Sequence, residues 1–177
     1  MNKVITIILM LVLALIGYKA YEYTYSEDVE FEMTNLKIIK ANNKGDSQAD
    51  AQGDAQTDSQ SNSAEEIHYN VKIADTVAER SMGLMFVEEM AEDSGMIFIF
   101  PTSRTREMWM KNTYVSLDML FITPEKEIKH IVESATPNST KRISSVVPVP
   151  YVLELKAGQV KKHGIKVGDR IEFEYKK

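Results

Sequence analysis

Short apolar stretches separated by turn residues run through residues 67–177, and they constrain the fold more than any other feature of the chain. Residues 67–73 alternate apolar with polar side chains, which is the pattern of a half-buried strand. Residues 96–100 form a continuous apolar run stopped by Pro101, as expected for a strand buried on both faces. Stretches of this length predict β-structure rather than long helices.

Two short helices are expected among these strands. Thr76 and Glu79 have the spacing of a capping box, so a helix should begin after Thr76. Gly83 can end it, because glycine tolerates the left-handed conformation. A second short helix is predicted at residues 159–163. With about seven strands in roughly 110 residues, the sequence predicts a mainly β, compact β-sandwich or barrel-like single domain.

Residues 106–122 hold two unusual side chains. They read as two strands joined by a polar turn, and they contain Trp109, the only tryptophan, and Asp118, an acid among apolar neighbours. Glu154 is likewise an acid among apolar neighbours, inside the strand expected at residues 151–155. A buried ionised carboxylate is costly unless a cation or hydrogen-bond donors compensate it. Each acid therefore fixes local structure or belongs to a functional site.

Two interpretations of this corner stay open. In the first, Asp118 and Glu154 satisfy neighbouring donors and Trp109 is a core residue. In the second, these groups line a pocket where the indole offers a flat apolar surface and polar groups orient a small polar or sugar-like ligand. The candidate ligand-binding residues are then Arg80, Arg106, Trp109, Lys111, Asn112, Thr113, Asp118 and Glu154.

Several short motifs occur in the order found in a known family. They are Gly83-Leu-Met-Phe86, Gly95-Met-Ile-Phe-Ile-Phe-Pro101, Trp109-Met-Lys-Asn-Thr113, Leu117-Asp118, Tyr151-Val-Leu-Glu-Leu155, Gly164-Ile165 and Gly168-Asp169. With these motifs, residues 67–175 of the chain resemble the domain of unknown function 192 family.

The resemblance implies a compact, mostly β domain, often exported or membrane-anchored, with a loose link to ligand binding and no assigned reaction. Two positions depart from the family pattern. Val87 stands where an arginine is common, and Met108 stands where an aromatic residue often precedes the tryptophan. By analogy, the motif positions of this chain are residues 85, 96, 109–113, 118 and 154.

Composition argues against several functions. The chain has no Cys, which removes disulfides, a cysteine nucleophile and thiolate zinc sites. Residues 67–177 carry 16 Lys and Arg against 15 Asp and Glu, so no basic surface predicts nucleic-acid binding. The sequence has no G-x-S-x-G, no H-E-x-x-H and no phosphate-cradling glycine loop. We therefore assign no catalytic residue and no cofactor.

Three alternatives remain beside small-ligand binding. One is a protein-interaction module of the cell envelope, with an unknown partner. In another, Asp118 and Glu154 serve a hydrolase, which requires carboxyl groups about 5–10 Å apart across an open cleft. In the third, thioethers bind Cu(I), for which they are soft ligands, although methionine also fills irregular cores. The candidate copper ligands are Met82, Met85, Met96 and Met110.

The N-terminus has the layout of a signal sequence, with Lys3 before an apolar run from Val4 to Gly17. Continued to residue 23, the run reaches about 20 residues, the length of a membrane span. We predict an anchor at residues 4–23, within a segment of residues 1–25, and a cleaved signal with a secreted product as the alternative. The charge distribution places the remainder outside the cytoplasm, in the periplasm or at the cell surface.

Residues 26–66 are expected to separate this anchor from a domain at residues 67–177. An Asp-x-Gln-x repeat at residues 46–61 has no large apolar side chain and predicts a disordered acidic spacer. Residues 1–66 carry 5 Lys and Arg against 11 Asp and Glu, so the acidity of the chain belongs here. Residues 28–33 alternate acidic and apolar side chains, which fits a short strand or a membrane-surface segment.

Overall fold

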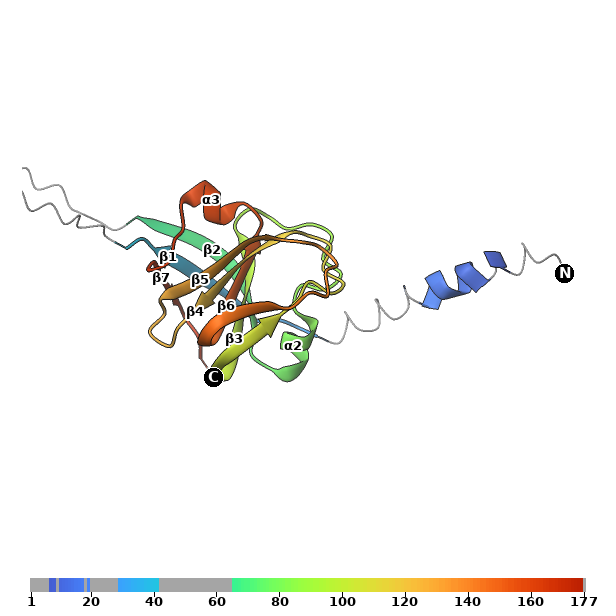
Figure 1. Ribbon diagram of the computed structural model, residues 1–177, viewed down its shortest axis with the longest axis horizontal. Coiled ribbons are helices and arrows are strands. Elements are labelled where there is room, and N and C mark those ends of the chain that lie inside the picture. Colours follow the sequence, from blue (N-terminus) through green and yellow to red (C-terminus); the bar gives the residue numbers. More distant parts are fainter. Residues whose placement is uncertain (1–6, 9, 18, 20–28, 42–64, 177) are drawn as a thin grey trace, which may run out of the picture.

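The computed structural model describes residues 7–8, 10–17, 19, 29–41 and 65–176. Its main body is a seven-stranded sheet with two short helices (Figure 1). The strands are β1 (Met33–Ile39), β2 (Glu66–Ala74), β3 (Ser94–Met108), β4 (Leu117–Ile122), β5 (Ile128–Ala135), β6 (Ile143–Lys156) and β7 (Arg170–Phe173), and the helices are α2 (Val77–Met82) and α3 (Gln159–His163).

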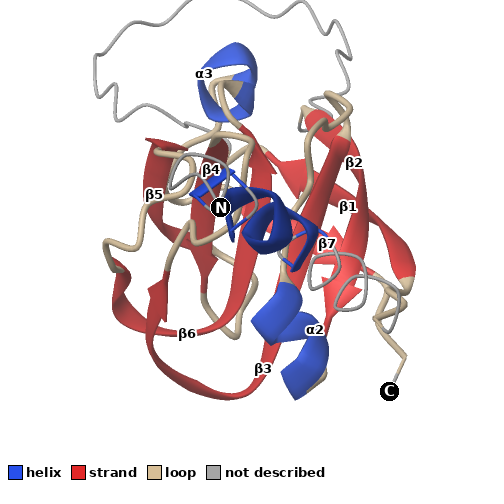
Figure 2. Ribbon diagram, turned by 90° about the vertical axis from the view of Figure 1, so that its right-hand side faces the viewer, coloured by secondary structure: helices blue, strands red, loops and turns tan. Residues whose placement is uncertain are grey.

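The sheet curls toward a barrel, and Figure 2 shows its strands wrapping around an interior. The strand order is β5-β4-β6-β3-β2-β1-β7. β2 and β3 pair in parallel, and the other neighbours pair antiparallel. The outermost strands meet at one end, where Ile128 N donates to Asp169 O and Gly168 N donates to Ile128 O, both at 2.9 Å. The predicted mainly β, barrel-like fold is confirmed.

Alternate side chains of β3 belong to different apolar clusters. Met96 and Phe98 pack with residues such as Met119 and Phe121, whereas Ile97 and Ile99 join a second cluster that includes Leu120 and Leu153. Neighbouring strand residues point to opposite faces, so the sheet has packed apolar side chains on both faces. The continuous apolar run at residues 96–100 is therefore a two-sided strand, as predicted.

Pro101 does not end this strand, contrary to the sequence prediction. β3 continues to Met108, although its pairing with β6 changes register between Ile99 and Arg104. Pro101 lies inside that interruption, where its missing N–H costs no ladder hydrogen bond. The longer strand carries the chain toward Trp109, which follows its last residue.

The sheet also begins earlier in the chain than predicted. β1 pairs with β2 on one side and β7 on the other, and its Leu36 and Ile38 are fully buried. The sheet of the domain predicted at residues 67–177 thus includes a strand that lies before residue 67. This short strand escaped notice because polar residues flank two alternating apolar positions. Residues 42–64 connect two paired strands, and the repeat predicted to be disordered lies outside the described residues.

The N-terminal residues 7–8, 10–17 and 19 are helical. Their large apolar side chains are exposed, with Leu13 at 59% and Leu15 at 64%. Among the described residues, no helix combines the length and apolar character needed to span a membrane. The rest of the predicted anchor falls outside that part of the chain.

The two helices in the domain begin and end near the predicted positions. Glu79 N donates to Thr76 Oγ1 at 3.2 Å, and Thr76 N donates to Glu79 Oε2 at 2.8 Å, so the capping box is confirmed. Gly83 ends α2 with a φ of 53°, and Gly164 ends α3 with a φ of 58°. Figure 1 shows α2 and α3 at opposite ends of the sheet.

Candidate functional site

A pocket of about 130 Å³ opens beside α2. Its walls come from α2 and the turn after it, from β3, from the loop that follows β3, and from β6. The polar side chains lining it are Arg80, Ser81, Glu107, Lys111, Thr113 and Glu154, and the apolar ones are Met82, Leu84, Met85, Phe98, Phe100, Met108 and Trp109.

Glu154 is the most unusual residue of this pocket. It lies on β6 between Met96 of β3 and Met119 of β4, both fully buried, and is itself only 4% exposed. No described residue forms a hydrogen bond or an ion pair with its carboxyl group. Burial raises the pKa of Glu154 to about 8, because a carboxylate loses hydration here without compensation. At neutral pH this acid is therefore mainly protonated and can donate a hydrogen bond.

Close packing of β3 against β6 contributes to that burial. A Cβ atom at Gly95 would lie 2.6 Å from the carbonyl oxygen of Glu154 and 2.9 Å from Leu155 Cδ2. Only glycine leaves room for this approach of the two backbones. The glycine of the sequence motif thus helps to set the backbone position from which the Glu154 side chain projects.

Arg80 is held in the pocket wall by main-chain oxygens. From the last turn of α2, its Nη1 donates to Asp75 O and, at 2.9 Å, to Ile99 O. Its guanidinium carbon lies 5.4 Å from the ring centroid of Phe100. These contacts fix the guanidinium group without neutralising its charge, and the Nε and Nη2 donors take part in none of them.

Trp109 lies at the rim and is 37% exposed. The Nζ atom of Lys111 lies 5.5 Å from the indole centroid, and the guanidinium carbon of Arg142 lies 4.5 Å from it. The aromatic surface is thus already in contact with cations, an interaction that the ring quadrupole favours. The first interpretation of the sequence made Trp109 a core residue, but its side chain is partly exposed at the pocket.

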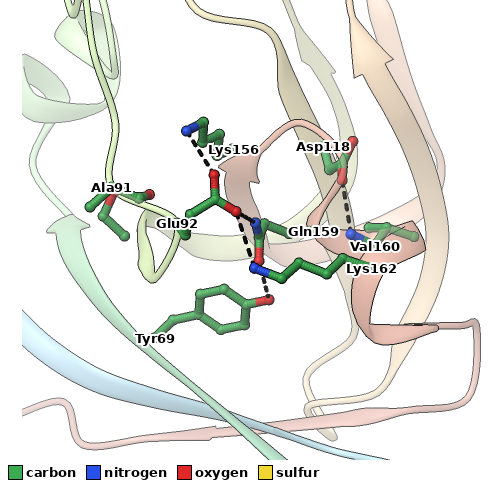
Figure 3. A network of polar contacts seen from close by, with 9 residues as sticks. Tyr69, Ala91, Glu92, Asp118, Lys156, Gln159, Val160 and Lys162 are labelled. Carbon is green, nitrogen blue, oxygen red and sulfur yellow. Dashed lines mark hydrogen bonds and ion pairs between the residues drawn. The ribbon is translucent and has the colours of Figure 1, made fainter.

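Asp118 lies away from this pocket, contrary to the sequence prediction. Its side chain is fully buried, and its carboxylate accepts hydrogen bonds from Ser134 N and Val160 N, both at 2.9 Å. Figure 3 shows the bond that links Asp118 to the start of α3. The acid therefore ties β4 to β5 and to α3, which is the structural role that the first interpretation gave it.

Register explains why the two acids separate. Asp118 pairs with Leu155, and Glu154 pairs with Met119, so the two carboxyl groups project from opposite faces of the sheet. Both side chains are buried, and no open cleft lies between them. The alternative of a hydrolase that uses Asp118 and Glu154 as a pair is therefore wrong.

Of the remaining candidate ligand-binding residues, some line the pocket and others lie next to its wall. Thr113 lines the pocket and is 5% exposed. Asn112 does not line it; its φ of 55° and the bond that its carbonyl accepts from Phe86 N at 2.7 Å make it a turn residue. Arg106 lies behind the wall, with its guanidinium carbon 4.0 Å from the centroid of Phe100. Lys111 and Asn112 form a turn between the end of β3 and the start of β4, in agreement with the prediction of two strands joined by a polar turn.

The four candidate copper ligands are split between two settings. Met82 and Met85 line the pocket, whereas Met96 and Met110 are fully buried in the apolar cluster beneath it. Among the described residues, no group of three or more His, Asp or Glu side chains gathers as a metal site.

Sequence reasoning missed Phe100 and Glu107 as pocket residues. Met96, Phe98 and Phe100 lie on the same face of β3, so the alternation of strand side chains could have predicted that Phe100 lies beside the pocket. Glu107 lies within the stretch at residues 106–122, but no local pattern marks this exposed acid as a pocket residue.

A separate polar network stabilises the opposite end of the sheet (Figure 3). Glu92 accepts from Gln159 Nε2 at 2.7 Å and forms ion pairs with Lys156 at 2.8 Å and Lys162 at 3.2 Å. These donors lower the pKa of Glu92 to about 2. Tyr69 extends the network through its hydroxyl, which donates to Gln159 Oε1 at 3.4 Å. Glu92 thus has hydrogen-bond and ion-pair partners, whereas Glu154 has none among the described residues.

Fold and pocket together define a curled β domain in which the wall of a small pocket holds an acid without a partner among the described residues. The chain belongs to the domain of unknown function 192 family, described as uncharacterized ACR, which it matches over residues 58–173. The resemblance drawn from the sequence motifs is thereby confirmed.

Two of the solved structures similar to this chain illustrate the relationship. A protein of Sinorhizobium meliloti 1021, described as a candidate transcription regulator, is 38% identical with a TM-score of 0.68, and the match covers 82% of this chain and 96% of that one. A protein of unknown function from Novosphingobium aromaticivorans DSM 12444 is 25% identical with a TM-score of 0.64, covering 79% of this chain and 84% of that one. No curated protein matches the chain.

Proposed function

We propose that this protein is a membrane-tethered, extracytoplasmic binding module that holds a small polar ligand in the Glu154 pocket. The observation that carries the proposal is the buried carboxyl group of Glu154, which has no partner in the described part of the chain. A buried polar group without a hydrogen bond costs about 1–3 kcal/mol. A ligand that supplies the missing partner recovers this cost.

The other lining groups fit such a role. Trp109, Phe98 and Phe100 give apolar surface, while Arg80, Lys111 and Thr113 supply donors. Small-ligand sites usually combine an apolar lining with a few converging polar groups. The pocket residues include no hydrogen-bonded nucleophile and base among the contacts of the described residues, so binding explains the arrangement better than catalysis.

Ligand binding can be tested with the only tryptophan as a reporter. We expect compounds from a thermal-shift screen of polar metabolites to change Trp109 fluorescence and to bind Glu154→Leu at least about tenfold more weakly, since that change removes the polar partner. Glu133→Leu is the matched control, because Glu133 is exposed on β5. Compounds that bind Glu154→Leu as tightly as the original chain would contradict the proposal.

The location of the domain is the second part of the proposal. The apolar helical residues at 7–8 and 10–17 and the basic residue before them support an anchor with the domain outside the cytoplasm. Because β1 begins at Met33, only about ten residues separate it from the anchor, which limits its distance from the membrane to roughly 35 Å. The domain would therefore stay close to the bilayer.

We expect the full chain to fractionate with membranes and to resist extraction at high pH. In intact spheroplasts, added protease should digest residues 65–176 while cytoplasmic markers survive. Recovery of the chain with soluble cytoplasmic proteins, or protection of the domain from that protease, would show that the predicted topology is wrong.

A further inference from the structure

The charges around the Glu154 pocket are unbalanced. Arg80 and Lys111 line it, and the guanidinium groups of Arg106 and Arg142 lie against Phe100 and Trp109, which also line it. None of these four cations forms an ion pair with a described residue. The hydrogen bonds of Arg80 and Arg106 end on main-chain oxygens, except that the backbone N–H of Arg106 donates to Ser145.

The basic residues also repel one another. Burial, followed by the charges of Arg104 and Arg80, lowers the pKa of Arg106. Grouping like charges is unfavourable unless something offsets the repulsion. Glu107 is the one exposed carboxylate in the lining, and it cannot balance several cations. The positive charges at and behind the pocket wall therefore favour the binding of a negatively charged group in the pocket.

Glu154 complements this rim as a neutral donor. The titratable groups that face the pocket with it are Arg80 from α2, Glu107 from β3 and Lys111 from the following loop, while uncharged Met96 and Met119 flank it within the sheet. Its pKa, raised by burial to about 8, keeps the O–H group in place near neutral pH. An O–H to an anionic oxygen is a strong hydrogen bond, whereas an ionised Glu154 would repel the anion.

We propose that the pocket binds the oxyanion of a small carboxylated or phosphorylated molecule, to which Arg80 and Lys111 donate from the rim and Glu154 donates from the buried wall. This inference rests on the proposed function and names its ligand class. It disfavours a neutral sugar stacked on Trp109, because Arg142 and Lys111 already approach that ring.

The oxyanion can come from a soluble molecule or from a lipid headgroup. Phe31, just before β1, packs against the apolar cluster that contains Phe98 of the pocket wall. Any anchor preceding β1 therefore joins the domain on the side of this cluster, which makes a lipid headgroup a candidate source. Both sources present the same chemistry, and the experiment separates them.

A matched series tests the ligand class. Glycerol, glycerate and glycerol 3-phosphate share a scaffold and differ in charge, and Trp109 fluorescence reports their binding to the full chain. We expect the two anions to bind at least about tenfold more tightly than glycerol. Phosphatidylglycerol vesicles, compared with phosphatidylcholine vesicles, form the lipid arm. Binding to the former without binding of the soluble anions identifies a headgroup as the source.

Variants test the donors. Arg80→Gln should weaken anion binding about tenfold or more, and Lys111→Gln about threefold or more, since each removes a charged donor. Lys111 is exposed, so its variant keeps the test valid if Arg80→Gln fails to fold. Arg170→Gln removes the same charge far from the pocket and should bind normally.

Proton linkage gives an independent readout. Glycerate stays ionised, so its affinity should fall about thirtyfold between pH 7 and pH 9.5 as Glu154 ionises. Glu154→Gln keeps an N–H donor and should lose this pH dependence. Glycerate affinity that stays constant across this range in the original chain would overturn the role of the Glu154 proton.

Failure of this inference differs from failure of the proposed function. If neutral compounds bind in a Glu154-dependent way while glycerate, glycerol 3-phosphate and anionic vesicles do not, the binding function stands and the oxyanion inference is overturned. If neither the anions nor any screened compound binds in a Glu154-dependent way, both are overturned.

Discussion

Glu154→Gln is expected to remove a large loss of stability that the original protein suffers as the pH rises from 4.5 to about 8. The ordinary carboxyl pKa of 4.5 applies to the unfolded chain, while burial raises the pKa in the folded protein to about 8. Between these values the unfolded state releases a proton that the folded state keeps. Stability therefore falls with rising pH in this window and levels off above it.

The size of the effect follows from the two pKa values. One pKa unit corresponds to about 1.4 kcal/mol, so the window is worth at most roughly 5 kcal/mol. Denaturant unfolding at pH 4.5, 6, 7.5 and 9 measures it. The stability difference between Glu154→Gln and the original chain should grow in favour of the variant as pH rises. A constant difference across these pH values would contradict a protonated Glu154.

Asp118→Ala should destabilise the fold by roughly 3–5 kcal/mol, because it removes the acceptor of the Ser134 N–H and leaves the buried Val160 N–H without a partner. Unlike Glu154, this acid has both its oxygens satisfied. Urea unfolding at pH 7 measures the loss. Glu133→Ala, an exposed acid on β5, should change stability by less than about 0.5 kcal/mol.

The same variant separates structure from binding. Where Asp118→Ala remains folded, its affinity for pocket ligands should match that of the original chain, because Asp118 faces away from the pocket. Normal stability combined with lost binding would contradict this account and restore the ligand role that the sequence alone allowed.

The comparison of Asp118 with Glu154 shows what local sequence can and cannot predict. Both are acids inside apolar strands, and nothing near them in the chain distinguishes their roles. The distinction arises because β4 pairs with β6 in a register that sets Asp118 opposite Leu155. Such register depends on strands about 35 residues apart, so the pattern within either strand does not contain it.

Elements with a complete local signal were predicted well. The capping box of α2, the alternation in β2 and the apolar run of β4 specify their structures through neighbouring residues. β1 was not predicted, because its two buried residues form a strand only by pairing with β2 and β7, which lie far away in the sequence. The end of β3 was wrongly predicted at Pro101, because a proline interrupts a strand only where the partner strand needs its N–H.

Part of the candidate site was also predictable. Trp109, Lys111, Thr113, Glu154 and Arg80 all line one pocket, although Arg80 precedes Glu154 by 74 positions. The imbalance of charge could not be foreseen, since residues 67–177 are nearly neutral as a whole. Folding brings Arg80, Arg106, Lys111 and Arg142 together around the pocket, whereas acids such as Glu92, Glu127 and Glu172 form ion pairs elsewhere.

The carboxyl resonance of Glu154 provides the most direct test of the central claim, that a protonated, unpaired acid lies within a reachable pocket. Protein labelled with ¹³C at the glutamate carboxyl carbon should show one resonance titrating near pH 8, absent from Glu154→Gln, and shifting when a pocket ligand is added. If every glutamate resonance titrates below about pH 5, as ordinary carboxyl groups do, the central claim is wrong.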